Sequence, residues 1–181
     1  FEFLVLNTAL SKNHKEILPE IIKWFSEDSL ENWYASKLIE NIFPSFSSDL
    51  ESFLLSLVQK KDTKGLEIAL HILEKYEGES FLYNVVREII KLYPMDETLK
   101  NRLYRILSGI KGVVSGECGF LDAYKLKKEQ IKNWLNDSST EVKEFAVEYD
   151  KFLDELINHE KDRVDKQIAF RKREFDINSK T

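Results

Sequence analysis

The chain has 181 residues, of which 43% are hydrophobic and 12% aromatic, so it can bury a substantial core and disorder is not its natural state. It contains only 6 Gly and 3 Pro, a scarcity that favours long helices over a turn-rich β fold. A single cysteine, Cys118, excludes an intramolecular disulfide and is typical of a reducing, cytoplasmic setting. No apolar run approaches the roughly 20 residues that cross a bilayer, so no membrane partner is expected.

The first segment, residues 1–6, is apolar but lacks the basic start, long apolar core and small-residue cleavage site of a signal peptide. It also lacks an initiator Met. We interpret it as part of a helix that packs on a preceding repeat of a longer polypeptide. A processed terminus is the alternative.

From residue 14 to residue 112 the sequence resembles itself at a shift of 34 residues, which brings many apolar positions into register. Three of these columns are Ile21, Leu55, Ile89; Ile39, Leu73, Leu107; and Asp28, Asp62, Asp96. Each unit contains two stretches with apolar residues at spacings of three and four, the pattern of an amphipathic helix. We therefore predict helix pairs at about 14–43, 47–76 and 79–108.

The recurrent Asp is expected at the turn inside each pair, where its carboxylate can accept the free N–H groups that open the second helix. Capping boxes of the form S-x-x-E are also present at 48–51 and 138–141. These local signals agree with the helix starts that the repeat predicts.

Such a pair cannot bury its apolar stripe alone, so neighbouring pairs must stack and share a core. A period of 34 suits tetratricopeptide repeats too, but these need small residues at helix crossings, and only Ala35 and Ala69 recur. The run Ile17-Leu18-Pro19-Glu20-Ile21 followed by Asp28 resembles the HEAT pattern. This resemblance implies an all-α, HEAT-like right-handed α-solenoid of about four helix pairs with a long C-terminal helix.

After the third pair, residues 109–119 are rich in glycine and are interpreted as an insertion between repeats. A fourth pair is predicted to begin near 121 and to end in a long charged helix that reaches about residue 175. We therefore divide the chain into residues 1–112, with three helix pairs after a partial N-terminal helix, and residues 113–181, with the insertion, the fourth pair and the extended helix.

Residues 109–176 carry a loose set of motifs: G-E-x-G-F at 116–120, a W-L-x-D turn at 134–137 and E-V-K-x-F-A at 141–146. This stretch resembles the terminal HEAT-like module of large bacterial multidomain proteins, some of which are similar to signal-transducing nucleotidases and antiphage sensors. The resemblance implies a receptor or packing role at the C-terminal end of a bigger chain. It supplies no catalytic residue.

Motifs for chemistry are missing from the sequence, which has no phosphate-binding loop, no dinucleotide fingerprint and no metal-binding pattern. No catalytic, cofactor-binding or metal-binding residue and no cofactor is predicted. Cys118 lies between two glycines, Gly116 and Gly119, and is interpreted as a structural thiol rather than a nucleophile. His71 is expected to be a packed or surface residue.

Two residues of the repeat are candidates for partner binding. Trp33 shares a column with Glu67 and Asn101, so we expect it to be exposed or to lie on a binding face. Arg102, in the next column, is the second candidate. Trp24 shares a column with apolar residues, which predicts a core position for it.

The extension of the last helix, residues 158–175, is mostly charged but keeps a thin apolar seam. The candidate contact residues there are Val164, Ile168 and Phe175 in the seam, and Arg171, Lys172 and Arg173 at its basic end. A solvated helix is one interpretation. The other is an arm that meets a partner helix or an adjacent subunit.

The leading hypothesis is a non-enzymatic macromolecular interaction module, the C-terminal binding, sensor or assembly part of a larger bacterial protein, with antiphage defence as a setting. The expected partner is a protein or a neighbouring domain. A nucleic-acid-binding repeat is the alternative, with a basic stripe of Lys60, Lys61, Lys64, Arg102 and Arg105. However, residues 161–173 hold six basic and two acidic groups, and the remaining 21 basic and 30 acidic residues give the rest of the chain a net charge of −9. A helical-repeat enzyme that acts on DNA would need a buried Asp beside Trp33.

Overall fold

A computed structural model gives the fold and describes residues 14–25, 29–79, 82–111, 116 and 118–178. These residues form helices and connecting turns without a β-strand among them, which confirms the expected all-α class. The chain divides into two compact units, an N-terminal unit, Phe1–Gly109, and a C-terminal unit, Ile110–Thr181. None of the helices in the described ranges combines the length and apolarity that crossing a bilayer requires.

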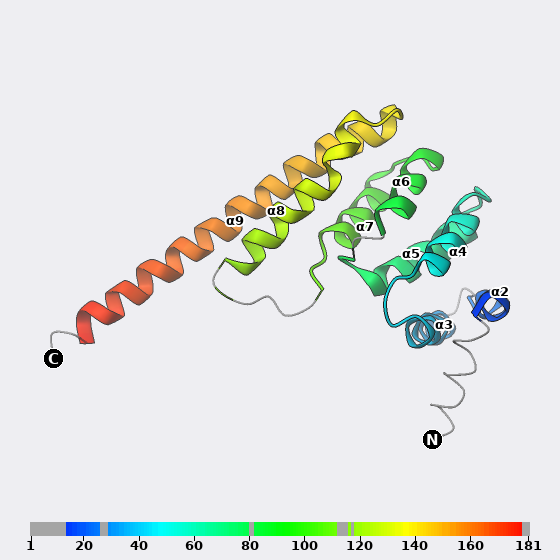
Figure 1. The fold of residues 1–181 in the computed structure, drawn as a ribbon, viewed down its shortest axis with the longest axis horizontal. Coiled ribbons are helices and arrows are strands. Elements are labelled where there is room, and N and C mark those ends of the chain that lie inside the picture. The colour runs from blue at the N-terminus through cyan, green and yellow to red at the C-terminus, as the bar shows by residue number, and fades with distance from the viewer. Residues whose placement is uncertain (1–13, 26–28, 80–81, 112–115, 117, 179–181) are drawn as a thin grey trace, which may run out of the picture. The chain divides into compact units, whose positions relative to one another are not determined.

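The described part of the N-terminal unit consists of successive helix pairs (Figure 1). They are α2 (His14–Lys23) with α3 (Ser29–Ile42), α4 (Ser48–Val58) with α5 (Thr63–Leu73) and its 3-10 extension η1 (Glu74–Tyr76), and α6 (Leu82–Leu92) with α7 (Glu97–Ser108). The helices lie where the 34-residue period predicts them. The described bounds of α4 and α6 end at Val58 and Leu92, which are 34 residues apart.

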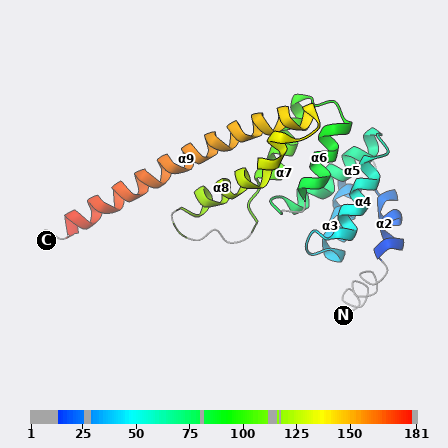
Figure 2. The same ribbon diagram turned by 45° about the horizontal axis from the view of Figure 1, so that its top comes forward.

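The helices of the N-terminal unit pack in two layers. Within pairs, α2 contacts α3, α4 contacts α5 and α6 contacts α7. Between pairs, the first helices α4 and α6 contact each other, and so do the second helices α3 and α5, an arrangement that Figures 1 and 2 show from two directions. The interior between the layers is apolar, and Leu54, Ile72 and Ile89 are each 0% exposed. Truncating one such side chain to Ala would cost about 2–5 kcal/mol.

Hydrogen bonds also tie successive pairs together. The Tyr76 hydroxyl at the end of the second pair donates to the carbonyl of Phe43 at the end of the first, at 2.6 Å. The Tyr93 hydroxyl of the third pair donates to the carbonyl of Val58 in the second, at 3.0 Å. Helix ends leave carbonyl groups without the usual α-helical partner, and these tyrosines use such acceptors to connect one pair to the next. The Val58 carbonyl also accepts the N–H of Lys61, at 3.1 Å.

The recurrent Asp caps the second helix of its pair, as predicted. The Asp62 carboxylate accepts the N–H of Gly65 at 2.6 Å and that of Asp96 accepts the N–H of Leu99 at 2.7 Å, so two N-caps lie 34 residues apart. Asp28 lies outside the described residues. In α5 the third position after the cap also needs a glycine, Gly65, since a Cβ there would come within 2.9 Å of the Leu57 carbonyl oxygen.

The two predicted capping boxes are wrong by one residue. The N-cap of α4 is Ser47, whose hydroxyl accepts the N–H of Leu50 at 3.3 Å, so Ser48 is already helical. At the start of the last helix, the Ser139 hydroxyl accepts the N–H of Val142 at 3.4 Å. The reason for this second shift is Asp137, whose carboxylate takes the Ser139 N–H at 2.9 Å and places the helix start one residue later.

Trp24 is not a core residue, contrary to the prediction, because 53% of its surface is exposed. The helix α2 ends at Lys23, so Trp24 lies in the turn that follows, with its N–H on the carbonyl of Ile21 at 3.0 Å. Its column partner Val58 is still helical and is 0% exposed. The buried position is instead taken by Phe25, at 3% exposure.

The C-terminal unit is a helical hairpin of α8 (Gly119–Ile131), the 3-10 turn η2 (Lys132–Asn136) and the long α9 (Thr140–Asn178). Figures 1 and 2 show α9 running back along α8 and continuing beyond it. Aromatic rings fill the closed end, with Trp134 and Phe145 centroids 6.3 Å apart and Phe145 and Tyr149 6.0 Å apart. With 39 residues, α9 is about 58 Å long.

Candidate interaction surfaces

Exposed aromatic side chains of the N-terminal unit gather on its first described helix pair. Among the described residues of this unit, the exposed large hydrophobic side chains are Trp24, Trp33 and Tyr34, at 53%, 52% and 57%. The rings of Trp33 and Tyr34 meet edge to face, with centroids 5.1 Å apart. The predicted exposure of Trp33 is therefore confirmed. We name these three residues the aromatic face.

A groove of about 480 Å³ lies between α3 and α5, and we name it the α3–α5 groove. Its described lining is Phe25, Asn32, Thr63, Lys64, Glu67, Ile68 and His71. Ile68 and Phe25 are buried apolar residues, whereas the other lining side chains are polar. Asn32 lies next to Trp33 in sequence, so α3 contributes both to the groove and to the aromatic face.

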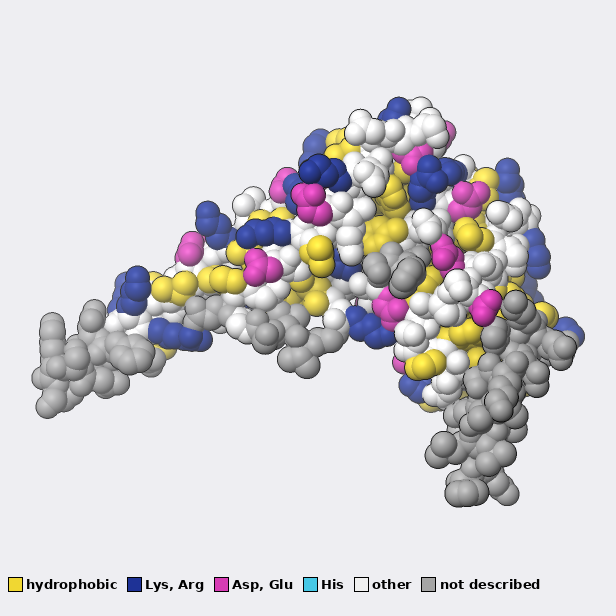
Figure 3. Space-filling model, viewed as in Figure 1, with side chains coloured by type: hydrophobic (Ala, Val, Ile, Leu, Met, Phe, Trp, Pro, Cys, Tyr) yellow, Lys and Arg dark blue, Asp and Glu magenta, His cyan; other side chains and the backbone are white. Residues whose placement is uncertain are grey.

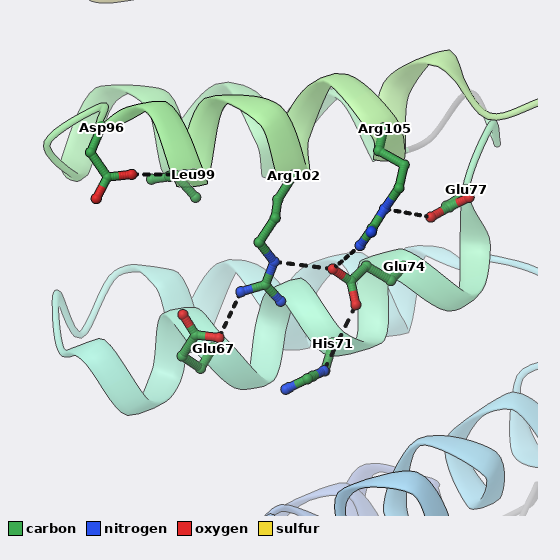
Figure 4. A network of polar contacts seen from close by, with 8 residues as sticks. All are labelled: Glu67, His71, Glu74, Glu77, Asp96, Leu99, Arg102 and Arg105. Atoms are coloured by element: carbon green, nitrogen blue, oxygen red, sulfur yellow. Dashed lines mark hydrogen bonds and ion pairs between the residues drawn. The ribbon is translucent and has the colours of Figure 1, made fainter. Parts of the chain in front are cut away.

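The neighbouring interface, between α5 and α7, is bridged by ion pairs (Figure 4), and Glu67 and Arg102 also line a pocket of about 310 Å³ there. We name it the α5–α7 seam. Arg102 of α7 reaches back to α5, with Nε 3.0 Å from Glu74 Oε1 and Nη1 2.7 Å from Glu67 Oε2. Arg105 adds contacts to Glu74 at 2.5 Å and to Glu77 at 3.4 Å. The candidate residue Arg102 is therefore engaged inside the N-terminal unit, with 21% of its side chain exposed.

The electrostatics of this seam follow from the same geometry. Burial by itself would lower the pKa of Arg102, but the hydrogen bonds and charges of Glu67 and Glu74 outweigh burial and raise that pKa above its ordinary value. At Glu77 burial raises the pKa of the carboxyl and the attraction of Arg105 lowers it. Burial is the larger effect, so the pKa of Glu77 is raised. The pairs thus hold one guanidinium in its charged state between two helices.

The 34-residue register explains why the ion pair of Arg102 with Glu67 has no counterpart at the corresponding positions of α3 and α5. Position 102 corresponds to Ile68 one repeat earlier, and position 67 corresponds to Trp33. At these two positions the α3–α5 interface therefore has Ile68 and Trp33 where the α5–α7 seam has Arg102 and Glu67. An isoleucine and a tryptophan cannot form an ion pair comparable to that of Arg102 with Glu67.

The seam residues predicted on α9 have different environments. Val164 is only 5% exposed, so its side chain belongs to the packed part of the C-terminal unit and is not offered to a partner. Ile168 is half-buried, and Arg171, Lys172 and Arg173 are exposed. The side chain of Phe175 lies outside the described residues.

The structure adds a residue that the sequence reasoning missed. Phe170 is 63% exposed on α9, and it lines a shallow hollow of about 400 Å³ together with Arg163, Lys166, Gln167 and Arg171. Figure 3 shows basic and hydrophobic side chains interspersed along this helix. The signal in the sequence was the spacing of three and four that joins Arg163, Lys166 and Phe170, a second face of the helix beside the one that contains Val164.

The basic stripe expected for nucleic acid is only partly present. Lys60, Lys61 and Lys64 are exposed. Arg102 and Arg105, in contrast, have their charges matched by Glu67, Glu74 and Glu77, as Figure 4 shows. The two arginines of the expected stripe therefore form ion pairs at the interface between α5 and α7.

The pairing that the DNA-enzyme hypothesis requires is not seen among the described residues. The buried acid there is Asp137, which belongs to the C-terminal unit, and Trp33 has Tyr34 as its ring neighbour. Cys118 is exposed rather than packed, and the thiol is free. His71 is partly exposed, with Nδ1 3.8 Å from a Glu74 oxygen, in agreement with the prediction of a packed or surface residue.

Comparisons with protein-family models, with curated proteins and with solved structures found no match to this chain.

Proposed function

We propose that this chain is a non-enzymatic protein-interaction module whose N-terminal unit is a HEAT-like, right-handed α-solenoid. Three features support the solenoid. The Asp caps of α5 and α7 are 34 residues apart, the first helices contact first helices, and the second helices contact second helices. A stack of this kind holds surface side chains on rigid elements, so binding loses less conformational entropy than binding by a loop would.

The observation that carries the proposal is the exposure of Trp33 and Tyr34 on α3, a helix that also contributes Asn32 to the α3–α5 groove. Trp and Tyr are the residue types that most often dominate the energy of protein interfaces, because they bury a large area with few rotatable bonds. Here Trp33 and Tyr34 remain more than half exposed, and their rings contact each other edge to face.

The test compares two double variants of α3 as baits. One replaces Trp33 and Tyr34 by Ala, and the matched control replaces Lys37 and Asn41, which are exposed on the same helix. Partners are captured from extract of cells that express the chain, identified, purified and then measured by calorimetry. We expect the aromatic variant to weaken binding about 30-fold, as loss of an interface hot spot does, and the control to bind normally.

The proposal is rejected if the two baits capture the same proteins with equal affinity. It is also rejected if everything captured is released by nuclease treatment. Circular dichroism of both variants establishes that α3 remains folded, so that a loss of binding reports the surface.

Nucleic-acid binding is the second candidate function, and a specific observation favours it. Residues 165–173 of α9 include four basic residues and one acidic residue, a net charge of +3, before Glu174 and Asp176 follow. If phosphate contacts dominate, affinity for a single-stranded oligonucleotide must fall steeply as salt is raised. Binding to a protein partner through the aromatic face would depend little on salt.

The biological setting is also part of the proposal. The resemblance of residues 109–176 to terminal modules of large bacterial proteins supports a place at the C-terminal end of a longer chain, with antiphage defence as one setting. In that arrangement a partner bound to the module would bias the conformation of the domains before it by binding one state more tightly than the other.

A further inference from the structure

The described end of α9 carries a face that its packing on α8 does not use. Arg163, Lys166, Phe170 and Arg173 follow one another at spacings of three, four and three residues, so they lie on one side of the helix. We name these four residues the basic face. Val164, which is buried, points in a different direction, about 100° around the helix from Arg163.

The charges of this face are largely available. Arg163 is paired with Glu160 of its own helix, with Nε 2.7 Å from Oε2, and this contact engages one N–H of the guanidinium. Lys166 and Arg173 are exposed, and no ion pair of theirs is seen among the described residues. Two cations thus stand on either side of the exposed ring of Phe170.

The shape beside these charges suits an apolar anchor. The hollow lined by Phe170, Lys166 and Gln167 has a volume of about 400 Å³, enough for a large aliphatic or aromatic side chain. An exposed Phe on a charged helix costs solvation free energy without a partner, because its apolar surface is left in water. A ligand for this face must therefore combine an apolar residue with surrounding negative charge.

We propose that the basic face of α9 binds an acidic amphipathic helix of a partner protein, with an apolar side chain of that helix in the hollow beside Phe170. This inference rests on the proposed role in protein interaction and names a partner class for the second unit. A helix laid along a helix presents side chains every three or four residues, which matches the spacing of the basic face. Its carboxylates would pair with Lys166 and Arg173.

Charge distinguishes this partner from nucleic acid or an anionic bilayer. Outside residues 161–173 the C-terminal unit has 8 basic and 13 acidic residues, so an extended polyanion would meet repulsion from the rest of this unit. A short acidic helix makes only local contacts within about one Debye length, roughly 8–10 Å, and does not meet that field. The single aromatic ring of the face also suits one anchor better than a series of stacked bases.

The experiment measures binding of fluorescein-labelled probes to the full chain by fluorescence anisotropy. The main probe is a synthetic helix of about five turns with Leu at spacings of three and four and Glu at most other positions. Its control is a scrambled peptide of the same composition. An oligonucleotide of mixed sequence and vesicles with anionic phosphatidylserine represent the other two classes of partner.

Two variants and two matched controls locate the site. Phe170→Ala removes the anchor, and Lys166→Glu with Arg173→Glu reverses the charge. Leu126→Ala and Lys151→Glu change an exposed apolar residue and an exposed cation of the same unit, away from the face. We expect about ten-fold weaker binding of the amphipathic helix to Phe170→Ala, a larger loss on charge reversal, and unchanged binding to the controls.

Three results would overturn the inference: equal affinity for the scrambled peptide, tighter binding of the oligonucleotide or vesicles, or equal binding by all variants. The Trp33 and Tyr34 variant should bind the acidic helix normally. Loss of helix binding in α9 variants that still capture the partner of the aromatic face would therefore support the inference independently. Absence of helix binding with intact partner capture would end the inference and leave the proposed function standing.

Discussion

The α5–α7 seam and the interface of α8 with α9 each place basic side chains between packed helices. In the first the pKa of the basic group is raised, whereas in the second one lysine has a lowered pKa and its neighbour a raised one. Arg102 is held by two carboxylates of α5, and its pKa is raised. In the C-terminal unit Lys127 is 5% exposed, and burial lowers its pKa to about 8. The next residue, Lys128, behaves like Arg102, because Asp154 and Asp150 outweigh its burial and raise its pKa.

The contrast between Lys127 and Lys128 shows what decides the outcome. Adjacent residues on a helix point about 100° apart, so one turns into the interior and the other to the rim. At the rim Lys128 meets Asp154 at 2.7 Å and Asp150 at 3.1 Å. A cation at a helix interface is therefore retained as a charge where carboxylates outweigh its burial, and it is shifted towards its neutral form where burial dominates.

Replacing Lys127 by Met should give the largest effect. The lowered pKa means that the unfolded chain binds more protons than the folded chain between pH 8 and 10.5, so the native protein gains stability as pH rises through this window. Below pH 8 the buried charge costs up to about 3 kcal/mol, as the lowering of the Lys127 pKa from 10.5 to about 8 implies. Lys127→Met should be more stable at pH 7 by about 1–3 kcal/mol.

Urea unfolding of the two proteins at several pH values, followed through the buried Trp134, measures this difference. The advantage of the variant should shrink from pH 8 towards pH 10. Lys125→Met, at an exposed position of the same helix, is the control and should leave stability nearly unchanged. Parallel stability curves for wild type and Lys127→Met would contradict the role of the buried charge.

Removing Arg102 should have the next largest effect and should act in the opposite direction. Arg102→Met leaves Glu67 and Glu74 beside an apolar side chain, which we expect to cost about 1–3 kcal/mol because hydrogen bonds to charged groups are lost. Combining it with Glu74→Gln should cost less than the sum of the single changes, and the difference measures the coupling. Lys100→Met is the control, since its pair with the exposed Glu97 is a surface contact worth under about 1 kcal/mol. Strict additivity in the double variant would show that the seam is not an energetic unit.

The helix positions could be predicted from sequence because they depend on a period that repeats. Apolar spacing located every described pair, and the Asp column located the caps of α5 and α7. Trp33 was recognised as exposed because its column is otherwise polar. The prediction of a core position for Trp24 was wrong because it assumed that every copy of the repeat has a first helix of the same length. The helix α2 ends at Lys23, one residue too early for Trp24 to occupy the helical position of its column.

The interaction surfaces were harder to predict because they depend on which side chains meet between helices. Nothing in a single helix says that Arg102 reaches two residues 28 and 35 positions earlier. Nor does the spacing of Val164, Ile168 and Phe175 tell which face of α9 is covered by α8. Burial of Val164 and exposure of Phe170 settle this point, and they move the candidate surface to the other face.

The smallest expected effect is that of removing an N-cap, which stabilises a single helix rather than an interface between helices. Asp62→Ala and Asp96→Ala each remove an N-cap with the same geometry, so each should cost about 1 kcal/mol in thermal or urea unfolding. Equal costs would mean that α5 and α7 start equally well, and that the Arg102 effect belongs to the α5–α7 seam. A much larger cost for Asp62 would mean that loss of the cap also displaces the backbone carbonyl of residue 62, which the Ala variant retains and which accepts the Tyr93 hydroxyl at 3.3 Å. Tyr93→Phe in both backgrounds distinguishes these two cases, because it removes the hydroxyl and leaves both caps in place.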